Sequence, residues 1–598
     1  MPPHSSRYTA KSFQVRLRPK TKDKPARAGR TDGGPAGRAG DTASSSSLSR
    51  TLTQTFLDNS LGGGTIQQLA HAGEAAGARG VGGLASAGGY GQHPGNIARD
   101  IRRQLIRLGN IPKSETFYWA DLPLWDVGQE RRLLHKIPVL LPHELLPVLL
   151  KNIPPRAAVP NSGTPGFSRF NHLCESLGLP LDTTIPLAIW GDGVPYTKKG
   201  SLIVVNLSVA GLPGSPRVPL LALPSKYLCK CGGCQGRHTL DVFWDIVPWS
   251  FRFLALGVTP QCRHDQQPWE EYDQHRAALG NTVLAQRGLM FQVKGDWEFL
   301  ASKLGLPSWA EVNICWWCAA QKDSFSTLTA ENMHALRRTS PAFFAQLRRD
   351  GKAPCPLFSV PGVTTESVVV DWMHCVDLGV GQDIVGGAIW TILGHYEGRT
   401  RAQKLTALFR RLQSFYVRTH TPSRIDALTL GMVKVVGRPA KLKSKAHECR
   451  CLVPFVAEEV LRWRGLHTGD AVLNLLHQAV DSLQQLGHLA AEEEWQATPA
   501  EHLLSSLGGA WNALAEVSPD VFRVKPKLHM LQHLVLHVAP LHGSPARYWN
   551  YLDEDWGGRL VKLAKHRGGG GRRGAGREAC TGAVLRSALS EKEVSMEV

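Results

Sequence analysis

The order of elements expected between residues 183 and 304 limits the fold of this chain more than any other feature. Three short β-rich runs come first, joined by turns that contain Gly and Pro, which is typical of an antiparallel meander. These runs span 185–190, 201–209 and 218–223. Apolar residues at helical spacing follow, and a fourth run, 288–293, ends in Gly295-Asp296. The order predicts an α/β fold with a mixed sheet and flanking helices.

Acidic residues follow the first and fourth runs. Asp192 lies in a Gly-Asp-Gly turn, and Asp296 comes directly after the fourth run. The order resembles that of the ribonuclease-H-like fold, in which strands one and four are neighbours and a third acid comes from a late helix. The cluster Asp553-Glu554-Asp555 opens such a helix, 556–565, and leaves the identity of the third acid open. Converging carboxylates would hold the pair of Mg²⁺ or Mn²⁺ ions used in phosphodiester chemistry.

A further acid, Asp371, follows three valines and precedes His374 by three residues. This spacing places both side chains on one side of a helical turn, where they could contact a metal or a phosphate. The alternative is a polar pair that fixes a buried turn.

Cysteine and histidine are clustered. One cluster has three Cys and one His within ten residues, enough for a tetrahedral Zn²⁺ site; a reduced cluster without metal is the alternative. Its members are Cys229, Cys231, Cys234 and His238. Cys315 and Cys318 would form half of a second zinc site, completed by distant residues such as Cys262 or His264, or else a redox pair.

His529 and His533 lie one helical turn apart. No Glu stands between them in the arrangement of a zinc protease, so a metalloprotease is excluded. We expect both residues to pack against or cap the helix before Glu554.

Composition divides the chain into six parts around this core. We expect a disordered basic Gly/Ala/Ser-rich tail, a helical N-terminal region, the first part of the core with its Cys/His knuckle, a mainly helical insertion that includes Asp371, the final core helices, and a disordered Gly/Arg-rich tail. In order, these parts are 1–95, 96–180, 181–327, 328–524, 525–566 and 567–598. No run is apolar enough to span a membrane, which indicates a soluble intracellular protein.

The charge of the chain favours a polyanionic partner. The 69 Lys and Arg exceed the 50 Asp and Glu, for a net charge of +19. Cations placed on phosphates release counterions, so DNA in the nucleus is one expected partner, and a surplus of charge that sits in solvated tails is the alternative. Arg237, Arg559 and Lys562 are candidate phosphate contacts, with solvated charge as the alternative.

Together these blocks resemble the catalytic region of eukaryotic DDE transposases of the CACTA and related superfamilies. The matching pieces are Gly191-Asp192-Gly193, Asp296 with Cys315-x-x-Cys318, Asp371-x-Met373-His374 with Gly379, Lys525-Pro526-Lys527-x-His529, and Glu554. The resemblance implies a transposon-derived protein with Asp192, Asp296 and Glu554 as catalytic acids. It makes Asp371 and His374 accessory residues, although Asp371 could instead be the second acid.

The activity implied is metal-dependent cleavage and transfer of DNA strands, and a homo-oligomer is compatible with it. One alternative is a domesticated or decayed transposase that binds DNA or chromatin without catalysis. Another is a zinc-stabilised interaction protein.

Overall fold

The computed structural model describes residues 47–57, 61–107 and 117–568 apart from a few single positions. Those positions are 152, 161, 164, 199, 213 and 328. The expected tails at 1–46 and 569–598 lie outside the described residues. Within the described part, no helix combines the length and apolar character that crossing a membrane requires.

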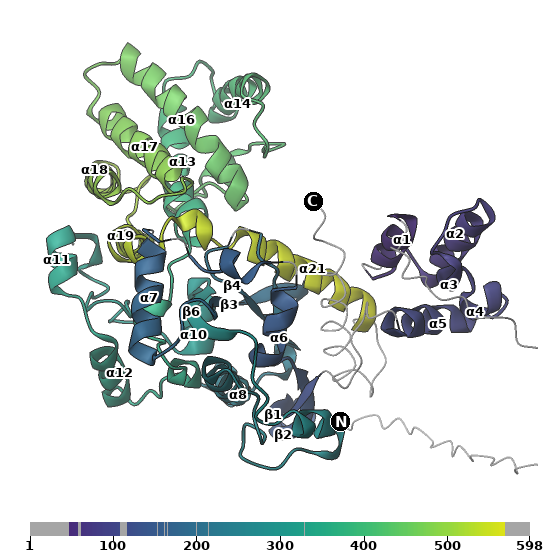
Figure 1. The fold of residues 1–598 in the computed structure, drawn as a ribbon. Helices are drawn as coiled ribbons and strands as arrows, with labels where there is room; N and C mark the ends of the chain where they lie inside the picture. The colour runs from purple at the N-terminus through teal and green to yellow at the C-terminus, as the bar shows by residue number, and fades with distance from the viewer. Residues whose placement is uncertain are drawn as a thin grey trace, which may run out of the picture. The chain divides into compact units, whose positions relative to one another are not determined.

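A mixed four-stranded sheet lies at the centre of the α/β core, in the order β5-β4-β3-β6 (Figure 1). Its strands are β3 (Thr184–Thr197), β4 (Gly200–Val209), β5 (Val218–Pro224) and β6 (Arg287–Gly295). β4 is antiparallel to both β3 and β5, whereas β6 is parallel to β3. The expected meander is therefore present, and the fourth strand of the sequence lies beside the first.

The segment 368–370 extends this sheet beyond β6. Val368 forms a parallel bridge with Val293, and Val369 N donates to Val293 O over 3.1 Å. The three valines are 0–6% exposed, because β-branched residues pack well in extended chain. Asp371 therefore stands at the sheet edge, where this segment meets the helical turn that follows it.

Four helices flank the sheet, and their bounds are α7 (Pro165–Leu177), α8 (Arg237–Leu256), α10 (Trp297–Leu304) and α21 (Tyr551–Gly568). α21 lies across β3 (Figure 1). Gly557 permits this approach, since a Cβ there would lie 2.9 Å from Val194 Cγ2 and 3.1 Å from the Trp190 ring. The late helix expected to carry the third acid thus packs on the strand that carries Asp192.

Helices α13, α16, α17 and α18 pack together as a bundle (Figure 1). Along the sequence, this bundle comes between β6 and α21. The helices of this region are α13 (Gly381–Ile392), α14 (Arg401–Arg418), α15 (Leu430–Val433), α16 (Ala446–Leu466), α17 (Ala471–Leu489) and α18 (Ala497–Val517). It is entered through the π-helical turn Met373–Val380 and left through α19 (Lys527–His533), the π-helical turn Leu534–Val538 and α20 (Ala539–His542).

The structure corrects two expectations for the N-terminal third. The tail 1–95 was expected to be disordered, yet helices begin at residue 47 and bury a small apolar core that includes Phe56, Ile66 and Ile101. A few apolar residues among the many Gly and Ala are enough to form this core, because the helices pack against one another. The helices are α1 (Ser47–Leu57), α2 (Gly63–Ala75), α3 (Gly82–Ala85), α4 (Ala87–Tyr90) and α5 (Pro94–Arg107).

The second correction concerns 96–180, which was expected to be helical. β1 (Tyr118–Asp126) and β2 (Arg131–Val139) form an antiparallel hairpin there, followed by α6 (Pro142–Leu149). Alternate residues of β1 are fully buried, the two-residue period of a strand with one face on a core. Leu140 N donates to Leu220 O over 3.0 Å, which joins the hairpin to β5.

Shorter helices complete the described chain. They are α9 (Gln274–Ala278), α11 (Ala330–Ala335) and α12 (Ser340–Arg349). The chain between α10 and α12 carries the Cys315-Cys318 pair.

Candidate active site and metal centres

Asp192 lies within β3, where it pairs with Val204, and not in the expected turn, and it interacts there with Asp296, which follows β6. Their preceding glycines, Gly191 and Gly295, are register partners in the parallel strands β3 and β6. Asp296 also caps α10, where its Oδ1 accepts from Phe299 N at 2.6 Å. Burial and then the negative charge of Asp296 raise the pKa of Asp192 to about 6.

The three acids that open α21 point to three different places. Asp553 is fully buried and forms ion pairs with Lys294 and, at 3.0 Å, with Arg217. Asp555 is exposed and pairs with Arg559 at 2.9 Å. Only Glu554 turns toward the sheet edge, as the 100° step between helix neighbours allows.

Glu554 completes a cluster with Asp192 and Asp296. Burial, followed by the negative charge of Asp192, raises the pKa of Glu554 to about 8, and Asp371 and Asp296 add to the effect. The structure therefore brings together the three acids that the resemblance selects, from segments as far apart as residues 192 and 554.

Asp371 and His374 lie in the same cluster. Asp371 Oδ2 accepts from His374 N at 2.9 Å and lies 2.7 Å from His374 Nδ1, while its Oδ1 accepts from Asn550 N at 2.8 Å. Asp371 thus fixes the turn and also orients the imidazole. His374 Nε2 lies 3.7 Å from Glu554 Oε1.

His374 carries the positive charge nearest to these acids. Its burial lowers the pKa, but the hydrogen bond to Asp371 and the charges of Glu554 and Asp296 outweigh burial and raise the pKa to about 9. One imidazolium does not balance the surrounding carboxylates. Glu554 Oε1 is moreover buried and accepts no hydrogen bond within the described part of the chain.

This carboxylate cluster has the chemistry of a divalent-cation site. Buried charges are stable when they are paired or bound to a metal, and carboxylate oxygens are the ligands that Mg²⁺ and Mn²⁺ prefer. Asp192, Asp296 and Glu554 could supply those ligands, although among the described residues only two Cys/His groups bring their ligand atoms within 4.8 Å of one another. Glu554 Oε1 is paired with His374 but has no hydrogen bond to any described residue.

Two further groups could hold a metal such as zinc, and in each the four ligand atoms lie within 4.8 Å of one another. One is the expected set Cys229, Cys231, Cys234 and His238. It stands just before and at the start of α8, where Cys231 Sγ lies 3.3 Å from His238 Nδ1. Three thiols and one imidazole match a closed tetrahedral zinc site.

The second group combines Cys315 and Cys318 with His529 and His533. Cys315 Sγ lies 3.2 Å from His533 Nε2, and Cys318 Sγ lies 3.4 Å from His529 Nε2. The expected completion by Cys262 or His264 was wrong, since His264 Nδ1 instead meets Tyr118 OH at 2.5 Å. The two histidines were expected only to pack or cap.

Backbone donors also support this second Cys/His group. Trp317 N donates to Cys315 Sγ over 3.2 Å, and Ala320 N donates to Cys318 Sγ over 3.4 Å. Such bonds favour thiolates and orient them. The group ties the loop after α10, next to Asp296, to α19.

The expected phosphate contacts lie elsewhere. Arg237 is 3.6 Å from Asp241 and donates to Ala353 O over 3.0 Å, and Arg559 is paired with Asp555. Lys562 is exposed on α21. None of the three lines the cavity next to the carboxylate cluster.

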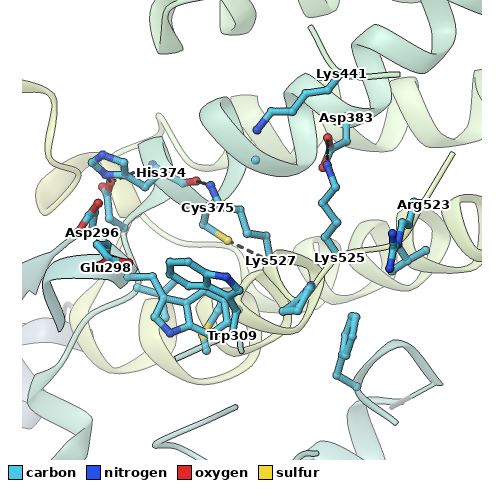
Figure 2. A pocket seen from close by; sticks show the side chains of 18 of the residues that line it. Asp296, Glu298, Trp309, His374, Cys375, Asp383, Lys441, Arg523, Lys525 and Lys527 are labelled. Atoms are coloured by element: carbon cyan, nitrogen blue, oxygen red, sulfur yellow. Dashed lines mark hydrogen bonds and ion pairs between the residues drawn. The ribbon is translucent and has the colours of Figure 1, made fainter. Parts of the chain in front are cut away.

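That cavity has a volume of about 980 Å³ and is lined by Asp296, Asp371 and His374, of which Asp296 and His374 lie at one end in Figure 2. The cavity is also lined by the cations Lys525 and Lys527 of the matching piece, and by others that the sequence did not single out, namely Lys322, Arg438, Lys441, Lys443 and Arg523. The sequence does contain closely spaced basic residues in 434–445 and 523–527. No local pattern, however, indicates that either segment lies near Asp296 in the folded protein.

No protein-family model matches this chain, and no curated protein sequence matches it.

Proposed function

We propose that this protein cleaves and transfers DNA strands with divalent cations held by Asp192, Asp296 and Glu554, as a transposase of the DDE type. The observation that carries the proposal is the meeting of these three carboxylates at one sheet edge. Burial, and then the negative charge of the neighbouring carboxylates, raises the pKa values of Asp192 and Glu554.

A ribonuclease-H-like core is part of the proposal. The strand order β5-β4-β3-β6, the extended segment beyond β6 and the late helix α21 on β3 are the arrangement expected of that fold. A fold alone does not establish a function, so the proposal rests on the acids and not on the sheet.

In the reaction, water attacks a phosphodiester phosphorus and the P–O3′ bond breaks. The freed 3′-hydroxyl then attacks a phosphorus of target DNA, whose own P–O3′ bond breaks so that the target 3′-oxygen leaves as a hydroxyl and takes up the proton released by the attacking hydroxyl. Bound cations would activate the attacking oxygen and stabilise the leaving oxygen. Asp371 holds His374 Nδ1, and Nε2 then faces the carboxylates where the scissile phosphate would bind. Protonated His374 adds a positive charge beside that phosphate.

The test compares cleavage by matched variants. Wild-type protein with Mn²⁺ should nick supercoiled DNA, and Asp192→Asn should reduce nicking by at least ~100-fold, since an amide binds cations poorly. Asp555→Asn is the control, because Asp555 lies on the same helix as Glu554 but is exposed and paired with Arg559.

Equal nicking by wild type and Asp192→Asn would refute the proposal. Wild-type protein that binds DNA and Mn²⁺ but leaves DNA intact would instead support the alternative of a domesticated DNA-binding protein. Zinc-dependent stability without any affinity for DNA would support an interaction protein.

A further inference from the structure

The cavity beside the carboxylate cluster has two chemically different walls. Figure 2 shows Asp296 and His374 at one end, Trp309 below, and Lys441, Lys525 and Arg523 toward the other end. The cavity is near the upper limit of ~1,000 Å³ for small-molecule sites, which is large for a site that only needs to hold metal ions. The size of the cavity and the residues that line it therefore indicate that it binds a ligand.

One wall is aromatic and already ordered. Trp297 packs edge-to-face with Trp309, at 5.7 Å between ring centroids, and with Trp316 at 6.3 Å. Trp297 Nε1 donates to Pro307 O over 2.9 Å, which fixes the central ring. Trp309 remains 43% exposed, so an indole face is available for stacking. The acids Glu298 and Asp323 also line the cavity.

The opposite wall is cationic. Lys525 pairs with Asp383 at 2.6 Å, and Lys527 donates to His374 O over 2.6 Å, so these two amines have partners. Arg438, Lys443 and Arg523 are exposed and form no ion pair with any described carboxylate. Free cations within one cavity are suited to the successive phosphates of a polyanion.

We propose that this cavity binds a short unpaired stretch of DNA, with bases stacked on Trp309 and phosphates on Arg438, Lys443 and Arg523. Stacking with cationic contacts is how proteins bind single strands without reading their sequence. Stacking on an indole requires a base with an uncovered face, which an unpaired strand offers and the stacked interior of a duplex does not, so the aromatic wall favours a single strand over a duplex.

The inference rests on the proposed function only for the role of the acidic end of the cavity. There the backbone of the unpaired strand would reach Asp296 and His374, so the substrate for cleavage would be a frayed or single-stranded DNA end. An intact duplex would have to open before it entered.

Binding is measured with a labelled single-stranded 12-mer that contains 2-aminopurine, and with a hairpin duplex of the same sequence. Buffers contain Ca²⁺ and no chelator, so that cleavage does not interfere and Cys/His sites keep any metal. The single strand should bind more tightly than the duplex. Its 2-aminopurine fluorescence should be quenched by stacking.

Trp309→Ala should weaken single-strand binding by about 5- to 100-fold, the usual effect of losing one stacked base, and abolish the quenching. Trp309→Phe should restore most of both. Arg523→Ala should lower the slope of log affinity against log salt by about 0.7, as expected for one lost phosphate contact. Arg252→Ala is the charge control, since Arg252 is exposed on α8 and does not line the cavity.

Three outcomes would overturn the inference. The first is an unchanged affinity for the single strand in both Trp309→Ala and Arg523→Ala, and the second is a duplex that binds as tightly as the single strand. The third is that polyglutamate displaces the labelled strand as readily as unlabelled single-stranded DNA does. Trp309 and Arg523 are exposed, so neither variant should unfold, and circular dichroism checks this. If these variants bind normally while wild-type protein nicks DNA, the cavity inference fails alone. If the wild type binds single strands as expected but never nicks DNA, the proposed function fails alone.

Discussion

At the scale of single residues, three consecutive acids of one helix have three different environments. Asp553 neutralises two cations inside the core, Glu554 joins the carboxylate cluster, and Asp555 is solvated. The sequence indicated that an acid of this group matters but left its identity open. Lys294, which forms the ion pair with Asp553, is 259 positions away along the chain, so no local sequence pattern could reveal this pairing.

Cation binding should release protons near neutral pH. Glu554, with a pKa of about 8, and Asp192, with a pKa of about 6, are partly protonated without a cation and must ionise to bind one. Mn²⁺ affinity should therefore rise between pH 6 and pH 8, by at most about tenfold per pH unit for each proton released. Calorimetry in two buffers of different ionisation heat measures the protons.

Asp192→Asn should weaken Mn²⁺ binding at least ~10-fold and release fewer protons, while Asp555→Asn should match the wild type. Affinity that does not change between pH 6 and pH 8 would contradict the role of these carboxylates as ligands.

At the scale of elements, the sequence predicted individual pieces better than their pairing. The strands β3 to β6 were foreseen because their β-branched runs are bounded by Gly and Pro. The site formed by Cys315, Cys318, His529 and His533 was not, although each half has a regular spacing. The halves are more than 200 residues apart, and only folding brings them together.

The two Cys/His groups should each bind one Zn²⁺. We expect two zinc ions per chain by elemental analysis, and one in either Cys318→Ser or Cys231→Ser. Cys318→Ser should lower the free energy of unfolding by ~3 kcal/mol or more, because its group is fully buried and joins two segments of the chain. Cys231→Ser should lower it less, because Cys231 is exposed. Two zinc ions retained in both variants would contradict these sites.

The position of α21 depends on a buried charge group. Asp553→Ala should leave Lys294 and Arg217 without their carboxylate in the interior, at a cost of about 3–5 kcal/mol in the free energy of unfolding. Asp555→Ala, two residues away but exposed, should change it by less than ~0.5 kcal/mol. Denaturant unfolding measures both, and equal effects would contradict this account.

At the scale of the whole molecule, the helical insertion is coupled to the core. Tyr551 OH donates to Asp377 over 2.6 Å, so the first residue of α21 contacts the π-helical turn that leads into the insertion. Lys525 pairs with Asp383 on α13. Residue order predicted that an insertion exists before the last acid, but these contacts depend on three-dimensional packing that the sequence pattern does not encode.

The free energy of unfolding should fall as the pH rises from about 4 to 8 when no divalent cation is present. Glu554, Asp192 and Asp377, whose pKa burial raises to about 7, all hold protons more tightly in the folded protein than in the unfolded chain. Their stabilising protonation is complete below their ordinary pKa values near 4 and is lost as the pH rises through 6 to 8. Stability should fall there by several kcal/mol, at about 1.4 kcal/mol for each tenfold change in proton binding.

One buried histidine acts in the opposite direction. His143 is buried and neutral, and burial lowers its pKa to about 4, so the unfolded chain takes up the proton first as the pH falls from 6.5. Thermal melts from pH 4.5 to 8.5 should therefore show stability falling as the pH rises, with His143 offsetting part of the loss below pH 6.5. Mg²⁺ should reduce the loss at alkaline pH by binding ionised Glu554 and Asp192, and Asp377→Asn should reduce it further, because the amide can still accept from Tyr551 OH. Stability that rises steadily to pH 8.5 would mean that these carboxylates are not held together in the folded protein.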